Sequence, residues 1–308
     1  MRIVSFFKKP LPDSLLNGLK DIAEIQYWQD LSEKERSELD DVEIVISNPP
    51  VSMQQELLSS FPNLKMIASL GVGFDKFDLE EMKRRKIVLT NAPTATSDDV
   101  ANFAWALLPA LASKPPQSVT HAREKLLTFS GFPLTTRISG KRLGVAGLGH
   151  IGREIARRGE GFKMQIGYTN LSACDVPYQR FENLKELAAW SDFLVLAMPG
   201  GASTHHIANR EVLEALGPQG FLINIGRGEL VDTDQLIEAL EKKNIAGAAL
   251  DVFEGEPAID QRLAQFDNLL ITPHIASGTF EARESTGLQA LENIQAFLST
   301  GTAPNRVV

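Results

Sequence analysis

Three side chains that can do chemistry follow apolar segments in the second half of the chain. Arg227 stands between two glycines directly after the apolar run FLINI (221–225), Glu256 lies just past the segment that contains Leu250, and His274 follows LLITP. Apolar runs of this kind predict strands covered on both faces, as in a parallel sheet between helices. Because the carboxyl ends of parallel strands meet at one edge of a sheet, we expect the three side chains to converge there.

The combined chemistry of this trio is that of 2-oxo acid reduction. A guanidinium is always charged, and its fork can bind a carboxylate and polarise a neighbouring carbonyl oxygen. A histidine can give a proton to that oxygen as hydride arrives, and a glutamate on its other ring nitrogen fixes its orientation. Two alternatives stay open. Glu254 competes with Glu256 for this role, and His274 taken alone can equally be a helix-capping or core residue.

A glycine-rich loop precedes the trio. The segment LGVAGLGHIG (143–152) contains a GxGxxG pattern formed by Gly147, Gly149 and Gly152, between an apolar segment and a predicted helix. The first glycine permits a tight turn, the second lets backbone approach a pyrophosphate, and the third lets helix and strand pack closely. The pattern predicts a Rossmann dinucleotide-binding lobe, the alternative being a glycine-rich turn without a ligand.

The segment YTNL (168–171) bears on the choice of coenzyme. About 20 residues after the glycine loop, NAD enzymes place an acidic residue that bonds the adenosine ribose and repels the 2′-phosphate of NADP. No carboxylate stands in this segment, and Thr169 can bond either ribose. We therefore expect NADP(H) to be favoured over NAD(H), with Arg180 as a remote candidate for binding the 2′-phosphate.

The composition excludes several classes of function. Lys+Arg 31 against Asp+Glu 39 gives a formal net charge of −8, which argues against a nucleic-acid or anionic-membrane surface. A single cysteine, Cys174, excludes a disulfide and a multi-thiolate site, and no metal site is predicted. His121, His205 and His206 lie in polar surroundings typical of a surface. The apolar stretch near the N-terminus is too short for a signal-peptide core, and no later run approaches the length of a membrane span, so a cytoplasmic protein is expected.

Strand and helix patterns alternate in both halves of the chain, up to about Asn91 and again from Arg142, which predicts parallel α/β sheets. Between them, residues 98–112 are apolar on nearly every face and predict a buried helix, packed between lobes or subunits and bent at Pro109. Residues 113–141 contain several prolines and glycines and are expected to be irregular.

Four segments in this order, GLGHIG, NIGRGELVD, ALDVFEGEP and TPHIASGT, resemble the D-isomer-specific 2-hydroxyacid dehydrogenase family. The resemblance extends over nearly the whole chain, including GVGFDKFDL and LTNAPTATSDDVAN in the first half. Within the family, LTTRISGKRLGVAGLGHIG and EVLEALGPQGFLINIGRG are most similar to glyoxylate/hydroxypyruvate reductases. The resemblance implies an oxidoreductase that transfers hydride between NAD(P)H and a small 2-oxo acid, giving a D-2-hydroxy acid.

The resemblance also implies an architecture and residue roles. A Rossmann NAD(P)-binding lobe (98–282) is inserted into a flavodoxin-like substrate lobe (1–97 and 283–308), with the active site in the cleft, and the family habit is a homodimer. Arg227 binds the substrate, and Glu256 partners the acid/base His274. The loop whose backbone amides hold the substrate carboxylate corresponds to Leu70, Gly71, Val72 and Gly73. Cofactor contacts are implied for Val100, Gly147, Leu148, Gly149, His150, Ile151, Gly152, Thr169, Asn170, Pro199, Thr204, Ile225, Gly226 and Asp251.

The chain departs from the family pattern in places. His150 stands where many relatives carry arginine, Leu171 replaces the arginine of NADP-preferring relatives, and the tryptophan that many relatives carry near Lys125 is missing. Within enzymes, a phosphoglycerate-type or other D-2-hydroxyacid dehydrogenase is the alternative. An alternative of another class is a cofactor-sensing, corepressor-like binding protein, against which the intact trio argues.

Overall fold

The computed structural model describes most of the chain, namely residues 1–7, 10–47, 55–124 and 131–308. It divides into two compact units: unit 1 comprises Met1–Ser97 and Gly278–Val308, and unit 2 comprises Asp98–Ser277. Each unit contains a parallel sheet, so the α/β class predicted from the sequence is confirmed. The sequence analysis placed the second lobe boundary at 282/283, whereas the chain returns to unit 1 at Gly278.

Unit 1 is built on a five-stranded sheet in the order β2-β1-β3-β4-β5, with all neighbours parallel. This is the flavodoxin-like strand order. Successive side chains of β3 alternate between two cores, because Val45 packs in one apolar cluster while Ile44 and Ile46 pack in the other. The strands are β1 (Arg2–Ser5), β2 (Glu24–Tyr27), β3 (Ile44–Ser47), β4 (Met66–Ser69) and β5 (Val88–Thr90).

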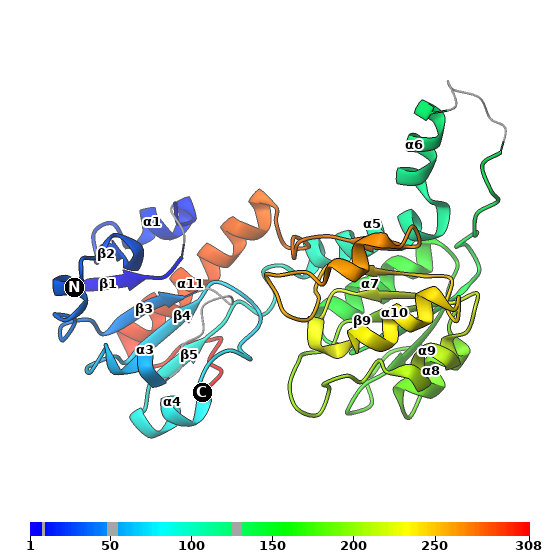
Figure 1. The fold of residues 1–308 in the computed structure, drawn as a ribbon. Helices are drawn as coiled ribbons and strands as arrows, with labels where there is room; N and C mark the ends of the chain where they lie inside the picture. Colours follow the sequence, from blue (N-terminus) through cyan, green and yellow to red (C-terminus); the bar gives the residue numbers. More distant parts are fainter. Residues whose placement is uncertain (8–9, 48–54, 125–130) are drawn as a thin grey trace. The chain divides into compact units, whose positions relative to one another are not determined.

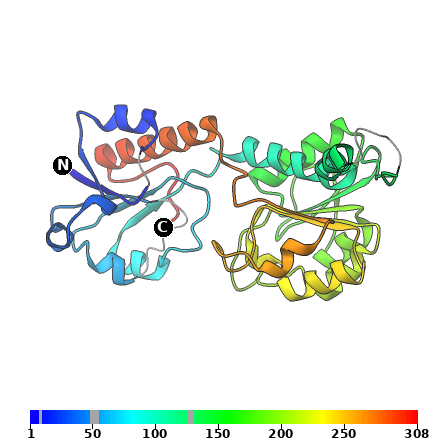
Figure 2. The ribbon, with the colours of Figure 1, turned by 45° about the horizontal axis from the view of Figure 1, so that its top comes forward.

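Helices cover both faces of this sheet (Figure 1). Helices α1 and α11 lie together on one face, and α3 and α4 lie on the other, as the turned view also shows (Figure 2). Neither α11 nor any other helix of the described ranges is both long and apolar enough to cross a membrane. The helices of unit 1 are α1 (Asp13–Leu19), η1 (Trp28–Asp30), α2 (Glu33–Arg36), α3 (Gln55–Ser59), α4 (Leu79–Arg85) and α11 (Phe280–Thr300).

Unit 2 is built on a seven-stranded parallel sheet in the order β12-β11-β10-β9-β6-β7-β8. The chain order reverses at β6, which has β7 on one side and β9 on the other. In open parallel sheets, ligands bind beyond the carboxyl ends of the strands at such a reversal. The strands are β6 (Arg142–Ala146), β7 (Gln165–Thr169), β8 (Gln179–Arg180), β9 (Phe193–Leu196), β10 (Phe221–Asn224), β11 (Gly247–Leu250) and β12 (Leu269–Ile271).

Two apolar layers sandwich the sheet of unit 2. Helices α5 and α7 cover one face and α8, α9 and α10 cover the other (Figure 1). Strand β9 serves both layers, since Phe193 and Val195 face one and Leu194 and Leu196 face the other. The helices are α5 (Ser97–Ser113), α6 (Pro115–Glu124), α7 (His150–Gly161), α8 (Leu184–Trp190), α9 (Arg210–Leu216), η2 (Gly228–Leu230), α10 (Thr233–Glu241) and η3 (Gln261–Gln265).

The expectation that residues 98–112 form a buried helix is confirmed, since α5 buries Ala104 and Leu108 in the core of unit 2. Another expectation about the linking region needs correction. Residues 115–124, which were expected to be irregular, form α6. Proline is compatible with the first turn of a helix, whose N–H groups have no partner within the helix, so Pro115 starts this helix instead of preventing it. The segment near Lys125, where relatives carry tryptophan, lies outside the described residues.

Candidate active site

The three candidate catalytic side chains follow three neighbouring strands of unit 2. Arg227 follows β10, Glu256 follows β11 and His274 follows β12. These strands are adjacent and parallel in the sheet, so their carboxyl ends lie at the same edge. All three residues therefore lie beyond the carboxyl ends of their strands, as the sequence predicted. Open α/β sheets bind ligands at this edge.

His274 and Glu256 form a hydrogen-bonded pair. Nδ1 of His274 lies 2.7 Å from Oε2 of Glu256, and the other carboxylate oxygen of Glu256 accepts a hydrogen bond of 3.0 Å from the backbone N–H of Phe253. The backbone of Phe253 thus fixes one oxygen of the Glu256 carboxylate, and the other oxygen orients the imidazole of His274. Because Nδ1 faces Glu256, Nε2 is the ring nitrogen available to a ligand, and 48% of the histidine side chain is exposed.

The backbone that carries His274 is held by Asp251, whose carboxylate is almost fully buried. It accepts hydrogen bonds from the hydroxyl of Thr272 at 2.7 Å and from the backbone N–H groups of Ile275 and Ala276 at 3.0 and 2.9 Å. A buried carboxylate must be satisfied in this way. From the sequence, Asp251 was expected to contact the cofactor, and its support of the His274 loop was not predicted. An acid directly after the apolar run IAGAAL was the available signal.

The loop that carries Arg227 is organised by Asn224 at the end of β10. The amide of Asn224 donates to the carbonyl of Arg227 at 2.8 Å and accepts from the N–H of Gly226 at 3.1 Å. The Arg227 guanidinium donates to the carbonyl of Gly226 at 2.8 Å. Gly228 allows this loop to approach the one after β11, because a Cβ there would lie 2.1 Å from the backbone of Phe253.

The competing carboxylate, Glu254, is engaged elsewhere. Its oxygens contact Nε2 of His206 at 2.5 Å and the backbone N–H of Thr233 at 3.1 Å. Burial alone would raise the pKa of the Glu254 carboxyl, but the hydrogen bonds from His206 and Thr233 lower the pKa below its usual range. Geometry thus pairs His274 with Glu256. His206, expected at the surface, is half-buried, whereas His205 is exposed as expected.

The glycine loop has the predicted strand–turn–helix context, between β6 and α7. Gly147 has a φ of +92°, a conformation that favours glycine, and a Cβ at Gly152 would lie 2.0 Å from the carbonyl oxygen of Gly147. Gly149 differs from both, because a Cβ there would meet no atom within 4 Å. The first and third glycines therefore serve the fold, and the second borders space open to a ligand at the N-terminus of α7.

The segment after β7 is tied to the glycine loop by Asn170. Its side-chain oxygen accepts a hydrogen bond of 3.3 Å from the N–H of Leu148. Thr169 is buried at the end of β7, whereas Leu171 is fully exposed and Arg180 is exposed on β8. No acidic side chain stands between Tyr168 and Leu171, so nothing in this segment repels a 2′-phosphate.

The remaining predicted cofactor residues all belong to unit 2 and lie at strand ends or on helices. Pro199 and Thr204 follow β9, and the Thr204 hydroxyl donates to the carbonyl of Pro199 at 3.0 Å. Ile225 and Gly226 follow β10. His150 and Ile151 open α7, and Val100 lies on α5.

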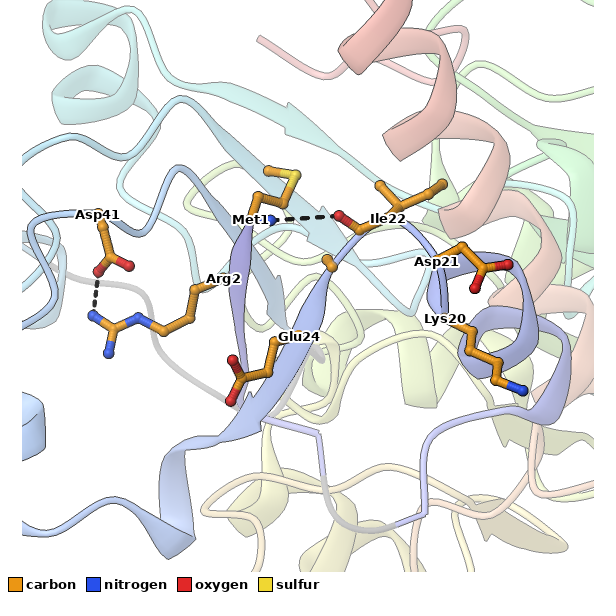
Figure 3. A pocket seen from close by; sticks show the side chains of 8 residues that line it. Met1, Arg2, Lys20, Asp21, Ile22, Glu24 and Asp41 are labelled. Atoms are coloured by element: carbon orange, nitrogen blue, oxygen red, sulfur yellow. Dashed lines mark hydrogen bonds and ion pairs between the residues drawn. The ribbon is translucent and has the colours of Figure 1, made fainter.

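In unit 1, the predicted carboxylate-binding loop Leu70–Gly73 follows β4. The carbonyls of Gly71 and Val72 accept hydrogen bonds from the N–H of Ala92 and the side chain of Asn91. A surface pocket of unit 1 lies elsewhere, at the amino ends of β1 and β2. Figure 3 shows its lining, including Arg2, which contacts Asp41. It does not include the predicted loop.

A model of the D-isomer specific 2-hydroxyacid dehydrogenase NAD-binding domain matches residues 106–276. The chain belongs to the D-isomer specific 2-hydroxyacid dehydrogenase family. The matched range contains the glycine loop and the Arg227, Glu256 and His274 trio. The chain is therefore an oxidoreductase with an NAD-binding domain.

Known members of the family are similar to this chain over most of their length. Hydroxyphenylpyruvate reductase of Plectranthus scutellarioides is 38% identical over 277 residues, covering 89% of this chain and 88% of that protein. Glyoxylate/hydroxypyruvate reductase A of Arabidopsis thaliana is 39% identical over 259 residues, covering 84% and 83%. The crystal structure of an NADPH-dependent glyoxylate/hydroxypyruvate reductase from Sinorhizobium meliloti, in complex with NADP and malonate, superimposes with a TM-score of 0.90 at 33% identity, covering 100% and 96%.

For a 2-hydroxyacid dehydrogenase, the open space beside Gly149 suits a dinucleotide phosphate, which leads to a paired prediction. Gly149→Ala is expected to leave the melting temperature unchanged and to weaken NADPH binding about tenfold, because the added methyl meets only the space that the phosphates would use. Gly152→Ala is expected to destabilise the fold by about 1 to 3 kcal/mol, because its Cβ would collide with the Gly147 carbonyl.

Thermal unfolding and NADPH fluorescence titration separate the two effects. Gly161→Ala is the matched control, because Gly161 also has open space around it and lies away from the loop. Gly140 is less suitable, because its positive φ would strain an alanine. If Gly149→Ala bound NADPH as tightly as the unaltered chain, the loop would not approach the coenzyme.

Proposed function

We propose that this dehydrogenase reduces a small 2-oxo acid, glyoxylate or hydroxypyruvate, to the corresponding hydroxy acid. The observation that carries the proposal is the His274–Glu256 pair, joined at 2.7 Å beyond the carboxyl end of the sheet, next to the strand that precedes Arg227. The names of the Arabidopsis and Sinorhizobium relatives support this substrate class.

In the proposed mechanism, a bound nicotinamide dinucleotide supplies the hydride. Arg227 binds the carboxylate of the oxo acid with its fork and polarises the neighbouring carbonyl oxygen. His274 gives a proton from Nε2 to that oxygen, and Glu256 stabilises the protonated ring through Nδ1. In the reverse direction, His274 takes the proton back from the hydroxyl group. The backbone amides of Leu70–Gly73 in unit 1 are proposed to bind a carboxylate.

We infer that the coenzyme is NADP(H) in preference to NAD(H). The absence of a carboxylate between Tyr168 and Leu171 supports this inference, because an acid there is the usual element that repels the 2′-phosphate. The Sinorhizobium relative is NADPH-dependent by its name. The residues proposed to surround the dinucleotide are those of the glycine loop, with Thr169 and Asn170 near the adenosine ribose.

A kinetic panel tests the proposed reaction. The loss of absorbance at the reduced-nicotinamide band is followed with glyoxylate, hydroxypyruvate, hydroxyphenylpyruvate and phosphohydroxypyruvate, each with NADPH and with NADH. We expect turnover with the two small oxo acids and a higher kcat/KM with NADPH. A preference for phosphohydroxypyruvate would indicate a phosphoglycerate-type enzyme, and tight NADPH binding without turnover of any acid would indicate a cofactor-sensing protein.

We also propose that the chain forms a homodimer. Helix α6 contains no buried residue, Val119 on it is exposed, and Leu134 in the following segment is fully exposed. In a dimer, a second copy would cover these exposed apolar side chains. Sedimentation at micromolar concentration should show a dimer. A stable monomer at that concentration would exclude the proposal.

A further inference from the structure

Three metal-binding side chains gather in unit 2 away from the His274–Glu256 pair. Nitrogen atoms of His205 and His206 and a carboxylate oxygen of Glu254 all lie within 4.8 Å of one another. His205 and His206 belong to the loop after β9, and Glu254 to the loop after β11. We propose that these residues form a binding site for a divalent transition metal of the zinc type. No metal site was predicted from the sequence, because the contact between the loop of His205 and His206 and the loop of Glu254 is formed only in the folded chain.

The two inner ligands are already oriented by outer partners. His206 presents Nε2 to Glu254 at 2.5 Å, and its Nδ1 lies 3.4 Å from a carboxylate oxygen of Asp232. The second oxygen of Glu254 accepts the N–H of Thr233 at 3.1 Å. Metal-binding histidines almost always donate their other ring N–H to a carboxylate or carbonyl, which fixes the ring and its tautomer. Asp232 lies beside Nδ1 of His206, and Thr233 binds one oxygen of the Glu254 carboxylate. Nε2 of His206 and Oε1 of Glu254, which contact each other, are therefore the atoms that would bind a metal.

Asp232 is itself held in place, which makes the support rigid. One of its oxygens accepts the N–H of Gln235 at 3.0 Å and the other accepts the Gln235 side chain at 2.6 Å. Asp232 is therefore the N-cap of α10. The backbone of His206 is fixed too, since its N–H donates to the carbonyl of Glu229 at 2.8 Å.

The exposed side chain of His205 would supply the third ligand. Its side chain is exposed and its ring stacks on that of His206, with ring centroids 3.9 Å apart. Within the described part of the chain, no hydrogen bond occupies the ring nitrogens of His205. The exposed ring can therefore rotate toward Nε2 of His206 without breaking a bond to the rest of the protein.

Two imidazoles and one carboxylate form a donor set typical of zinc, and the same set suits nickel and copper. Three protein ligands leave one position of a tetrahedron for water. A metal binds only ring nitrogens that carry no proton, so metal and protons compete for the two imidazoles and affinity should increase with pH.

The site would join two loops that carry proposed active-site residues. The loop after β9 contains Thr204, and Glu256 follows Glu254 closely in the loop after β11. Metal binding is measured directly in the test below, so the inference does not depend on the proposed oxo acid reduction.

Isothermal titration of zinc chloride into the untagged, chelator-treated full chain tests the site. We expect one zinc ion per chain with a dissociation constant of roughly micromolar order, and tighter binding at higher pH. His205→Ala should weaken zinc binding by about tenfold or more. This variant should keep its far-ultraviolet circular dichroism and its activity without zinc, because the ring is exposed and lies outside the proposed catalytic machinery.

Two matched histidine variants identify the site. His121→Ala removes a histidine on α6 and should leave zinc binding unchanged. His274→Ala removes the histidine of the other His–Glu pair and should also leave zinc binding unchanged. The proposal is overturned if no saturable binding is found up to the solubility limit of zinc, if His205→Ala binds zinc like the unaltered chain, or if His274→Ala abolishes binding.

Discussion

Replacing His274 with alanine is expected to lower kcat for glyoxylate or hydroxypyruvate reduction by a factor of about 10² to 10⁴, the usual contribution of a general acid. The proton that Nε2 delivers would then have to come from water. The affinity for NADPH should change little, because the histidine acts on the substrate oxygen. Steady-state kinetics with saturating NADPH, together with a fluorescence titration of the coenzyme, measure both quantities.

Variants of the two nearby glutamates make this test specific. Glu256→Gln keeps a hydrogen-bond partner for Nδ1 but removes the charge that stabilises the protonated ring, so kcat should fall and the pH profile should change. Glu254→Gln alters the carboxylate that contacts His206 and should leave the pH profile of kcat in place. A His274→Ala enzyme with more than about a tenth of the original kcat would exclude His274 as the acid.

Replacing Arg227 with lysine is expected to lower kcat/KM for the oxo acid by about 100-fold, although the positive charge is retained. An ammonium group cannot make the paired, planar contact that a guanidinium makes with a carboxylate, and a charge-assisted hydrogen bond contributes about 1.5 to 3 kcal/mol. Most of the loss should appear as a higher KM. The kcat/KM of Arg227→Ala should be lower than that of Arg227→Lys. Initial rates over a range of oxo acid concentrations separate KM from kcat.

Arg262→Lys provides the control, because Arg262 forms surface ion pairs with Asp260 and Asp234 and is not among the proposed substrate contacts. This variant should have unchanged kinetics. If Arg227→Lys turned over the oxo acid as well as the unaltered chain, bidentate binding by Arg227 would be excluded.

Much of the fold follows from local sequence patterns. Apolar runs such as FLINI and the glycine loop predicted the parallel sheets and the strand–turn–helix at Gly147, because both depend on residues close in sequence. Helix α6 was missed because Pro115 and Pro116 were taken as breakers, although proline fits the first turn of a helix. Helix α5 was recognised, but its position against its own sheet depends on tertiary packing that its sequence does not specify.

The position of the candidate site could be predicted from the sequence, but its side-chain contacts could not. Residues that follow strands could be assigned to one edge of the sheet, but the choice between Glu254 and Glu256 required the loop geometry that joins one to His206 and the other to His274. The support of the His274 loop by Asp251 depends on hydrogen bonds between segments more than twenty positions apart. Such contacts leave no periodic pattern, so inspection of a single sequence does not reveal them.

A crystal structure of the chain with NADP⁺ and oxamate, a non-reacting analogue of a 2-oxo acid, tests the proposed reaction centre most directly. The proposal predicts that the Arg227 guanidinium contacts the oxamate carboxylate and that Nε2 of His274 lies about 3 Å from its carbonyl oxygen. Oxamate bound without Arg227, or a His274 ring that makes no contact with it, would contradict the proposal.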